Sequence, residues 1–235
     1  MTEKNYYERY WEKQSASNGK GVAELPPEWN EGDLERILAF CNGKIRGRVL
    51  DAGCGDGFFA AQICQRFNLK NVHGLDVSSK AIDLAGTKYP EIIFQQGSLS
   101  HIPEETNSID SVTMVEVIEH LIDVEGTLKE LFRVLKPGGI LLITTTDFNW
   151  IKQVIIAMFF FEKYFYPTNP HIRFFTKSTL AGSAGTAGLP ALPSAGLSSL
   201  APVAQAISNA NPITPKTRKN MWRPMKRIAA KKSIL

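Results

Sequence analysis

Cysteines are few in this sequence. Cys41, Cys54 and Cys64 are the only three among 235 residues. Their odd number and scattered spacing give neither a disulfide framework nor a CxxC metal motif, so no metal site is expected. The longest uninterrupted apolar run, Val154–Phe161, has eight residues, whereas a membrane span needs about 20. The first residues, MTEKNYYERYWEK, lack the apolar stretch of a signal peptide. These features predict a reduced, cytoplasmic protein.

Acidic residues are absent after Glu162. Residues 163–235 hold 11 Lys/Arg and no Asp/Glu, whereas residues 1–162 hold 16 Lys/Arg and 23 Asp/Glu, a net charge of −7. A negatively charged body makes nucleic acid a poor partner, while the basic end suits an anionic surface such as a membrane. With 43% hydrophobic and 21% charged residues, the composition excludes a chain that is disordered throughout.

Short apolar runs alternate with amphipathic ones between residues 48 and 145. Alternation of this kind predicts parallel βαβ units, with helices on both faces of the sheet. The expected fold class is therefore α/β, with a doubly wound, mostly parallel sheet. Strands are expected at 48–52, 72–77, 92–96, 109–117 and 140–145, and helices at 57–67, 79–88 and 122–135.

The segments outside this alternation differ in character. Residues 5–14 and 33–40 read as helices, and 150–166 is a strongly apolar, aromatic helical stretch. Residues 178–215 carry no charge and are rich in Ala, Gly, Ser, Pro and Leu. We therefore expect one domain over residues 1–180 and an irregular, low-complexity and basic tail over 181–235.

The sequence VLDAGCGDGFF places Gly53, Gly55 and Gly57 between an expected strand and an expected helix. Glycine permits a sharp turn and the close approach of a ligand, and the first βα turn of such a sheet is the usual ligand crevice. Asp76 ends the next strand, 25 residues after Asp51, where an acid suits hydrogen bonds to ribose hydroxyls. A tight turn without a ligand is the simpler alternative.

The spacing of this turn discriminates among ligands. Dinucleotide-binding turns favour G-x-G-x-x-G, whereas this chain has G-x-G-x-G preceded by Asp51. A carboxylate at that position would repel a pyrophosphate and attract an ammonium group. The pattern therefore indicates a nucleoside linked to a cationic amino acid and disfavours a nicotinamide oxidoreductase.

Six segments together resemble the class I S-adenosylmethionine-dependent methyltransferases, in the small-molecule group that includes the ubiquinone-pathway enzymes. In family order they are VLDAGCGDG, GLDVS, FQQGSLSHIP, SIDSVTMVEVIEHLID, LKPGGILLITTT and HIRFFTKSTL. The resemblance covers about residues 45–180. It implies a Rossmann-like fold with S-adenosyl-L-methionine as cofactor, followed by an atypical C-terminal tail.

The resemblance also implies roles for individual residues. The glycine turn would hold the methionine part of the cofactor, the end of the second strand its ribose, and the segments after the third and fourth strands its adenine and methionine ends. The family often has an acid where Ser98 stands, although a hydroxyl still accepts a hydrogen bond. The implied cofactor-binding residues are Asp51, Gly53, Cys54, Gly55, Asp76, Val77, Gly97, Ser98, Leu99 and Glu116.

His120 is the candidate catalytic residue. A histidine at this edge has a pKa suited to a general base. Alternatively, Glu119 and His120 orient the following helix, and methyl transfer relies on proximity and alignment. Aromatic residues in 5–14 form either a lid over the cofactor or simple packing against the body.

The expected function is methyl transfer to an oxygen, nitrogen or carbon of a small molecule. In the family, the segment matching 150–166 covers the acceptor. Its aromatic content here indicates an apolar acceptor or contact with a membrane surface, with core packing as the alternative. A non-catalytic cofactor-binding protein, or a partner subunit of an active methyltransferase, is the second functional hypothesis.

Overall fold

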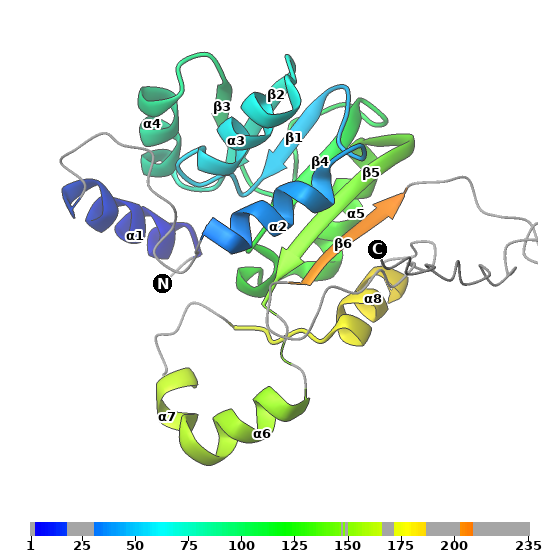
Figure 1. Ribbon diagram of the computed structural model, residues 1–235. Helices are drawn as coiled ribbons and strands as arrows, with labels where there is room; N and C mark the ends of the chain where they lie inside the picture. Colours follow the sequence, from blue (N-terminus) through cyan, green and yellow to red (C-terminus); the bar gives the residue numbers. More distant parts are fainter. Residues whose placement is uncertain are drawn as a thin grey trace, which may run out of the picture.

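The computed structural model describes residues 3–17, 31–146, 148, 150–165, 172–186 and 203–208. Its centre is a six-stranded sheet in the order β3-β2-β1-β4-β5-β6 (Figure 1). Strands β1 to β5 are parallel and β6 is antiparallel to β5, which confirms the predicted mostly parallel sheet. The strands are β1 (Val49–Ala52), β2 (Val72–Asp76), β3 (Ile93–Gln96), β4 (Ile109–Val115), β5 (Leu135–Thr145) and β6 (Val203–Ser208).

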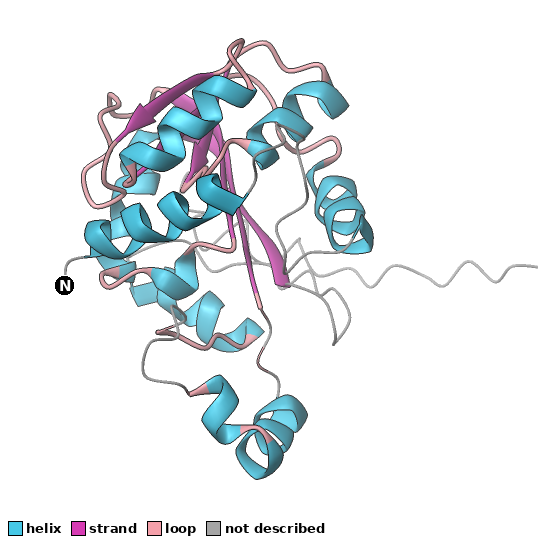
Figure 2. Cartoon of the chain, turned by 90° about the vertical axis from the view of Figure 1, so that its left-hand side faces the viewer, coloured by secondary structure: helices cyan, strands magenta, loops and turns pink. Residues whose placement is uncertain are grey.

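Helices cover both faces of the sheet, as Figure 2 shows. Polar side chains fix two of their starts: Ser78 accepts a hydrogen bond from the Ala81 amide, and Asp123 accepts one from the Gly126 amide. The α-helices are α1 (Glu3–Ser17), α2 (Glu31–Cys41), α3 (Phe58–Phe67), α4 (Ser79–Lys88), α5 (Val124–Val134), α6 (Trp150–Phe159), α7 (Phe161–Tyr164) and α8 (Lys177–Thr186), and η1 (Ile118–His120) is a 3₁₀ turn.

Two apolar clusters hold these layers together. On one face, Leu128 and Leu131 of α5 and Leu180 of α8 pack against β4 and β5. On the other face, Ile37 of α2 and Ile63 of α3 pack against β1 and β2. Strands β1, β2 and β4 lie between these layers, so most of their residues are buried, whereas the edge strand β3 is largely exposed.

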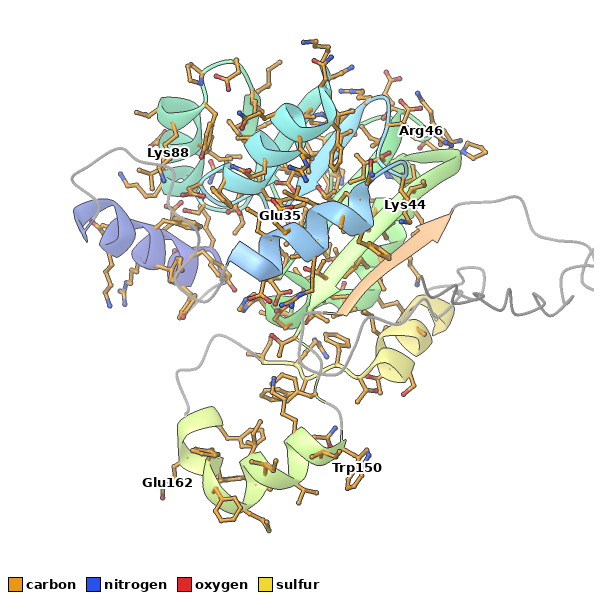
Figure 3. The ribbon with its side chains drawn as sticks, viewed as in Figure 1. Glu35, Lys44, Arg46, Lys88, Trp150 and Glu162 are labelled. Atoms are coloured by element: carbon orange, nitrogen blue, oxygen red, sulfur yellow. The ribbon has the colours of Figure 1, made fainter. Side chains whose placement is uncertain are left out.

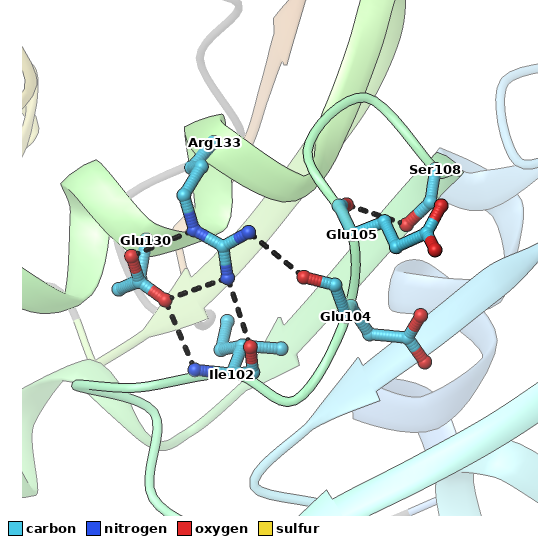
Figure 4. Close-up of polar contacts among 6 residues, drawn as sticks. All are labelled: Ile102, Glu104, Glu105, Ser108, Glu130 and Arg133. Carbon is cyan, nitrogen blue, oxygen red and sulfur yellow. Dashed lines mark hydrogen bonds and ion pairs between the residues drawn. The ribbon is translucent and has the colours of Figure 1, made fainter.

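Arg133 of α5 fixes the loop that leads from β3 to β4 (Figure 4). Its guanidinium donates to the Ile102 and Glu104 carbonyl oxygens, each at 2.8 Å. Glu130 pairs with Arg133 and also accepts from the Ile102 amide at 3.0 Å. This network anchors the chain directly after the expected adenine segment.

Strand β5 differs from the prediction at its start. It begins at Leu135, which pairs with Ile109, and the register then shifts so that Ser111 pairs with Ile140. The Pro-Gly-Gly sequence lies in this irregularity, where Gly138 has φ +77°. A bulge thus accommodates residues that we expected to lie before the strand.

The expectation of an irregular tail is wrong for two stretches. Helix α8 continues to Thr186, and residues 203–208 pair with Ile140–Thr145 of β5. Strand pairing uses backbone groups, and it satisfies the edge that β5 would otherwise expose. Residues 187–202 and 209–235, with the basic end, lie outside the described part of the chain. The domain boundary at residue 180 stays a prediction.

Helices α6 and α7 extend away from the sheet (Figure 1), and Trp150 points outward from α6 (Figure 3). Trp150 is 72% exposed and Phe159 69%, whereas Ile156 is buried. The predicted helical stretch is therefore confirmed, but most of its large apolar side chains are exposed and do not pack in the core. None of the helices in the described ranges combines the length and apolar character that crossing a bilayer requires.

Candidate functional site

The glycine turn follows β1 and depends on its glycines. The Gly53 amide donates to the Leu75 carbonyl at 2.7 Å, and Gly53 and Gly55 have φ values of +79° and +52°. A Cβ on Gly53 would lie 2.6 Å from Val117 Cγ2, and one on Gly55 would lie 2.7 Å from Trp11 Cζ2. Both positions therefore require glycine on conformational and steric grounds.

Asp76 ties this turn to the end of β2. Its Oδ2 accepts from the Gly55 amide at 3.0 Å, and its Oδ1 accepts from the Ser78 amide at 2.9 Å. Burial raises the pKa of Asp76. A carboxylate accepts about four hydrogen bonds, so Asp76 retains capacity for ribose hydroxyls.

Asp51 is the buried acid at the base of the turn. It is 2% exposed, and the Thr113 hydroxyl donates to its Oδ1 at 2.7 Å. Its Oδ2 has no hydrogen-bond partner among the described residues. Burial raises the pKa of Asp51 to about 7. A buried carboxylate oxygen without a donor fits a ligand that brings a cation.

The segment after β3 lies beside Asp76. The Gly97 amide donates to the Asp76 carbonyl at 2.8 Å, and Gln96 Nε2 donates to the Val77 carbonyl at 3.0 Å. The Ser98 hydroxyl lies 2.8 Å from the Ser100 hydroxyl and accepts from the Ser100 amide at 3.2 Å. Leu99 belongs to the core cluster on the α5 face. The topology thus gathers the expected adenine residues at the same sheet edge as the glycine turn, where Cys54 is also buried.

Two glutamates lie after β4. Glu116 has φ +53°, and its carboxylate accepts hydrogen bonds from Thr144 at 2.9 Å and Thr146 at 3.4 Å. Glu119 is 2% exposed. Burial raises the pKa of both glutamates, and for Glu119 the neighbouring Glu116 raises it further. The two carboxyl groups therefore interact with each other after the end of β4.

His120 ends the η1 turn. Its ring centroid lies 6.0 Å from that of Tyr7 in an edge-to-face arrangement. The Glu119 carbonyl accepts from the Ile172 and Arg173 amides at 3.1 Å, and Arg173 Nε donates to the Leu121 carbonyl at 2.8 Å. Arg173 therefore has a structural role in holding this turn. Both roles weighed for His120, base and orienting residue, stay predictions.

Helix α1 lies over this edge of the sheet. Trp11 meets the glycine turn at Gly55, and Tyr7 meets His120. Glu8 hydrogen-bonds to the start of α4, a contact that the sequence analysis missed. No sequence motif distinguishes Glu8 from an acidic residue that simply faces solvent.

A glycine turn after the first strand and an acid ending the second define a nucleotide-cofactor-binding domain of the doubly wound class. Residues 50–143 match a family model described as a methyltransferase domain. The matched region resembles the class I S-adenosylmethionine-dependent methyltransferases, which use S-adenosyl-L-methionine as cofactor.

Individual relatives agree with this assignment. A protein from Mycolicibacterium smegmatis named a probable S-adenosylmethionine-dependent methyltransferase is 35% identical over 113 residues, covering 48% of this chain and 42% of that protein. A ubiquinone biosynthesis O-methyltransferase from Aliivibrio fischeri is 30% identical over 132 residues, covering 53% of this chain and 54% of that protein. The chain thus spans about half the length of these curated relatives.

A solved structure shows the same fold. Magnesium protoporphyrin IX methyltransferase from Synechocystis, with bound SAH, superposes with a TM-score of 0.64 at 16% identity. The superposition covers 88% of this chain and 98% of that one.

Proposed function

We propose that this protein binds S-adenosyl-L-methionine and transfers its methyl group to an oxygen, nitrogen or carbon of a small molecule. The unpaired oxygen of Asp51 at the base of the glycine turn carries the proposal, because the cofactor has an ammonium group that fits it. The named relatives support the same activity.

The residues at the sheet edge fit this cofactor. Asp51 would pair with its ammonium group, Asp76 would accept its ribose hydroxyls, and Val77 would flank its adenine. When bound, the cofactor supplies a sulfonium methyl group to a nucleophilic acceptor atom. The chain itself contributes orientation and enclosure, and His120 is proposed as the residue that accepts a proton from the acceptor.

Calorimetric titration tests the binding step. We expect S-adenosylmethionine and S-adenosylhomocysteine to bind, and reduced nicotinamide dinucleotide to serve as a control that does not. If neither adenosyl ligand binds at millimolar concentration, the proposed function is wrong.

The second hypothesis is a cofactor-binding protein without catalysis, or a partner subunit. Ser98 motivates this hypothesis. The family often has an acid at this position, and a serine hydroxyl would bind the adenine amino group less strongly than a carboxylate does. Persistent binding of S-adenosylhomocysteine, without turnover over a broad acceptor panel, would favour this hypothesis over the first.

Helices α6 and α7 support an apolar acceptor and a peripheral membrane contact. Two rows of side chains spaced by four residues lie exposed along α6, and such spacing forms one continuous helix face. An apolar face turned outward, in a chain whose last 73 residues have only basic charges, suits an anionic lipid surface. The rows are Trp150, Val154 and Met158, and Ile151, Ile155 and Phe159.

Vesicle co-sedimentation tests this contact. We expect binding to phosphatidylcholine vesicles that contain phosphatidylglycerol, and weakened binding when Ile155 and Phe159 are both changed to Ser. Ile93→Ser is the matched control, since Ile93 is 75% exposed on β3. Equal sedimentation of all three proteins would contradict the contact. The cytoplasmic location stays a proposal.

A further inference from the structure

Helix α1 is joined to the start of α4 by a single carboxylate. Glu8 accepts hydrogen bonds from the Ser79 amide at 2.8 Å, the Lys80 amide at 3.2 Å and the Ser78 hydroxyl at 3.1 Å. These bonds lower the pKa of Glu8. Amides in the first turn of a helix have no partner within the helix, and the helix dipole favours an anion there. Glu8, 70 residues before Ser78 in the sequence, supplies both a hydrogen-bond acceptor for these amides and a negative charge at the helix N-terminus.

The residues of α1 next to Glu8 contact the candidate site. Trp11 lies three positions after Glu8, and its indole meets the glycine turn at Gly55. On the other side of Glu8, Tyr7 lies against His120. The helix therefore crosses the ends of β1, β2 and β4, and its Glu8 contact sits directly after Asp76, the expected ribose ligand.

The electrostatics around Glu8 link it to the same site. Glu8 is one of the groups that raise the pKa of Asp76. Two carboxylates so near one another repel, so the backbone amides of α4 must outweigh that repulsion for α1 to stay in place. The contact is directional, so it fixes the position of α1 along the start of α4.

We propose that Glu8 is a positioning residue of the cofactor site, which fastens α1 to α4 so that Trp11 closes the glycine turn over the bound cofactor. This rests on the proposed function. The cofactor then leaves only after α1 releases, and loss of the Glu8 carboxylate speeds its release. Glu8 touches neither the acceptor nor the reacting atoms in this proposal.

The test compares Glu8→Gln with Glu12→Gln. Both variants remove one negative charge from the same helix, and Glu12 is exposed one turn away. Displacement of radiolabelled S-adenosylhomocysteine by an excess of unlabelled ligand, followed by rapid filtration, gives the dissociation rate and can be used for every variant. We expect Glu8→Gln to raise this rate about tenfold, the effect of losing charge-assisted hydrogen bonds, and Glu12→Gln to change it less than twofold. Trp11→Phe should also speed release while leaving the α4 contact intact.

Further measurements separate positioning from general stability. The melting temperature without ligand should be similar in both glutamine variants, and Glu8→Asp should restore part of the slow release. An unchanged release rate in Glu8→Gln would overturn the proposal. Tighter binding would also overturn it, because α1 would then obstruct the site rather than close it.

Failure of the proposed function gives a different result. In that case the wild-type protein binds no cofactor at all. The fastening is then measured without ligand, by hydrogen exchange of the α1 amides, which should be faster in Glu8→Gln than in Glu12→Gln. Equal exchange in the two variants would contradict the role of Glu8 independently of the cofactor.

Discussion

Replacing Asp51 by Asn should stabilise the ligand-free protein at pH 8 and weaken cofactor binding. Burial raises the pKa of Asp51 from 3.8 to about 7. A carboxyl group with a raised pKa in the folded state holds its proton more tightly than in the unfolded state. The free energy of unfolding therefore falls as pH rises from about 4 through 7. A shift of roughly three units corresponds to about 4 kcal/mol once the group is ionised.

Asparagine does not ionise, so the variant avoids this loss in the free energy of unfolding, but it introduces a smaller cost of its own. Its amide oxygen can still accept the hydrogen bond from Thr113, while its amide nitrogen replaces the unpaired Oδ2. A buried donor without a partner costs about 1–3 kcal/mol. The net expectation at pH 8 is a gain of about 1–3 kcal/mol in the free energy of unfolding. Below about pH 4 the carboxyl group is protonated in both folded and unfolded states, so only the amide cost remains and the variant should be about 1–3 kcal/mol less stable than wild type.

Urea unfolding of both proteins between pH 4 and pH 8.5 measures the effect. Burial also raises the pKa of Asp76, Glu116 and Glu119. The difference between wild type and variant therefore reports Asp51 together with its electrostatic interaction with Asp76. Titration with S-adenosylhomocysteine should show binding weakened by about 2–3 kcal/mol, because a charge-assisted hydrogen bond is lost. Wild-type affinity should rise as pH increases through 7.

Two results would refute this reasoning. If the Asp51→Asn protein is no more stable than wild type at pH 8, the ionised carboxylate of Asp51 must have a hydrogen-bond donor or contact with solvent. An unchanged affinity for S-adenosylhomocysteine would mean that the cofactor's ammonium group lies elsewhere.

Three further predictions concern the turn, the ribose ligand and the sheet edge. Asp76→Ala should weaken calorimetric binding of S-adenosylhomocysteine by about 1–3 kcal/mol, and unchanged affinity would show that the ribose site is misplaced. Gly53→Val should abolish binding, since its Cβ would lie 2.6 Å from Val117 Cγ2; Gly86→Val, with open space around it, should bind normally in the same titration. Truncation after Thr186 removes β6 and should lower the free energy of unfolding in urea by roughly 3 kcal/mol or more, at about 1 kcal/mol per lost hydrogen bond. An unchanged urea midpoint would show that β6 does not stabilise β5.

The sequence alone determined the order of elements from β1 to β5, and it predicted the sheet edge at which the candidate site lies. Local patterns carry this information, because apolar runs, glycines and prolines act within a few residues. The turn at Gly53 and the acid Asp76 could both be found from spacing. Parallel strands bring their carboxyl ends to one edge, so these positions had to lie together.

Only the tertiary structure decided the contacts that span long separations. Val203–Ser208 pairs with β5, although its small residues show no convincing strand periodicity, because the backbone of an open edge selects a partner by hydrogen bonding. Glu8 reaches α4 across 70 residues, and Asp51 Oδ2 has no donor among the residues that the structure describes. Neither the Glu8 contact nor the environment of Asp51 can be predicted from residue type, because hydrogen-bond partners and burial are set only when segments distant in sequence pack together. The sequence could therefore predict where a cofactor site would lie, whereas the contacts of α1 with that edge and the raised pKa values of the buried acids depend on the folded chain.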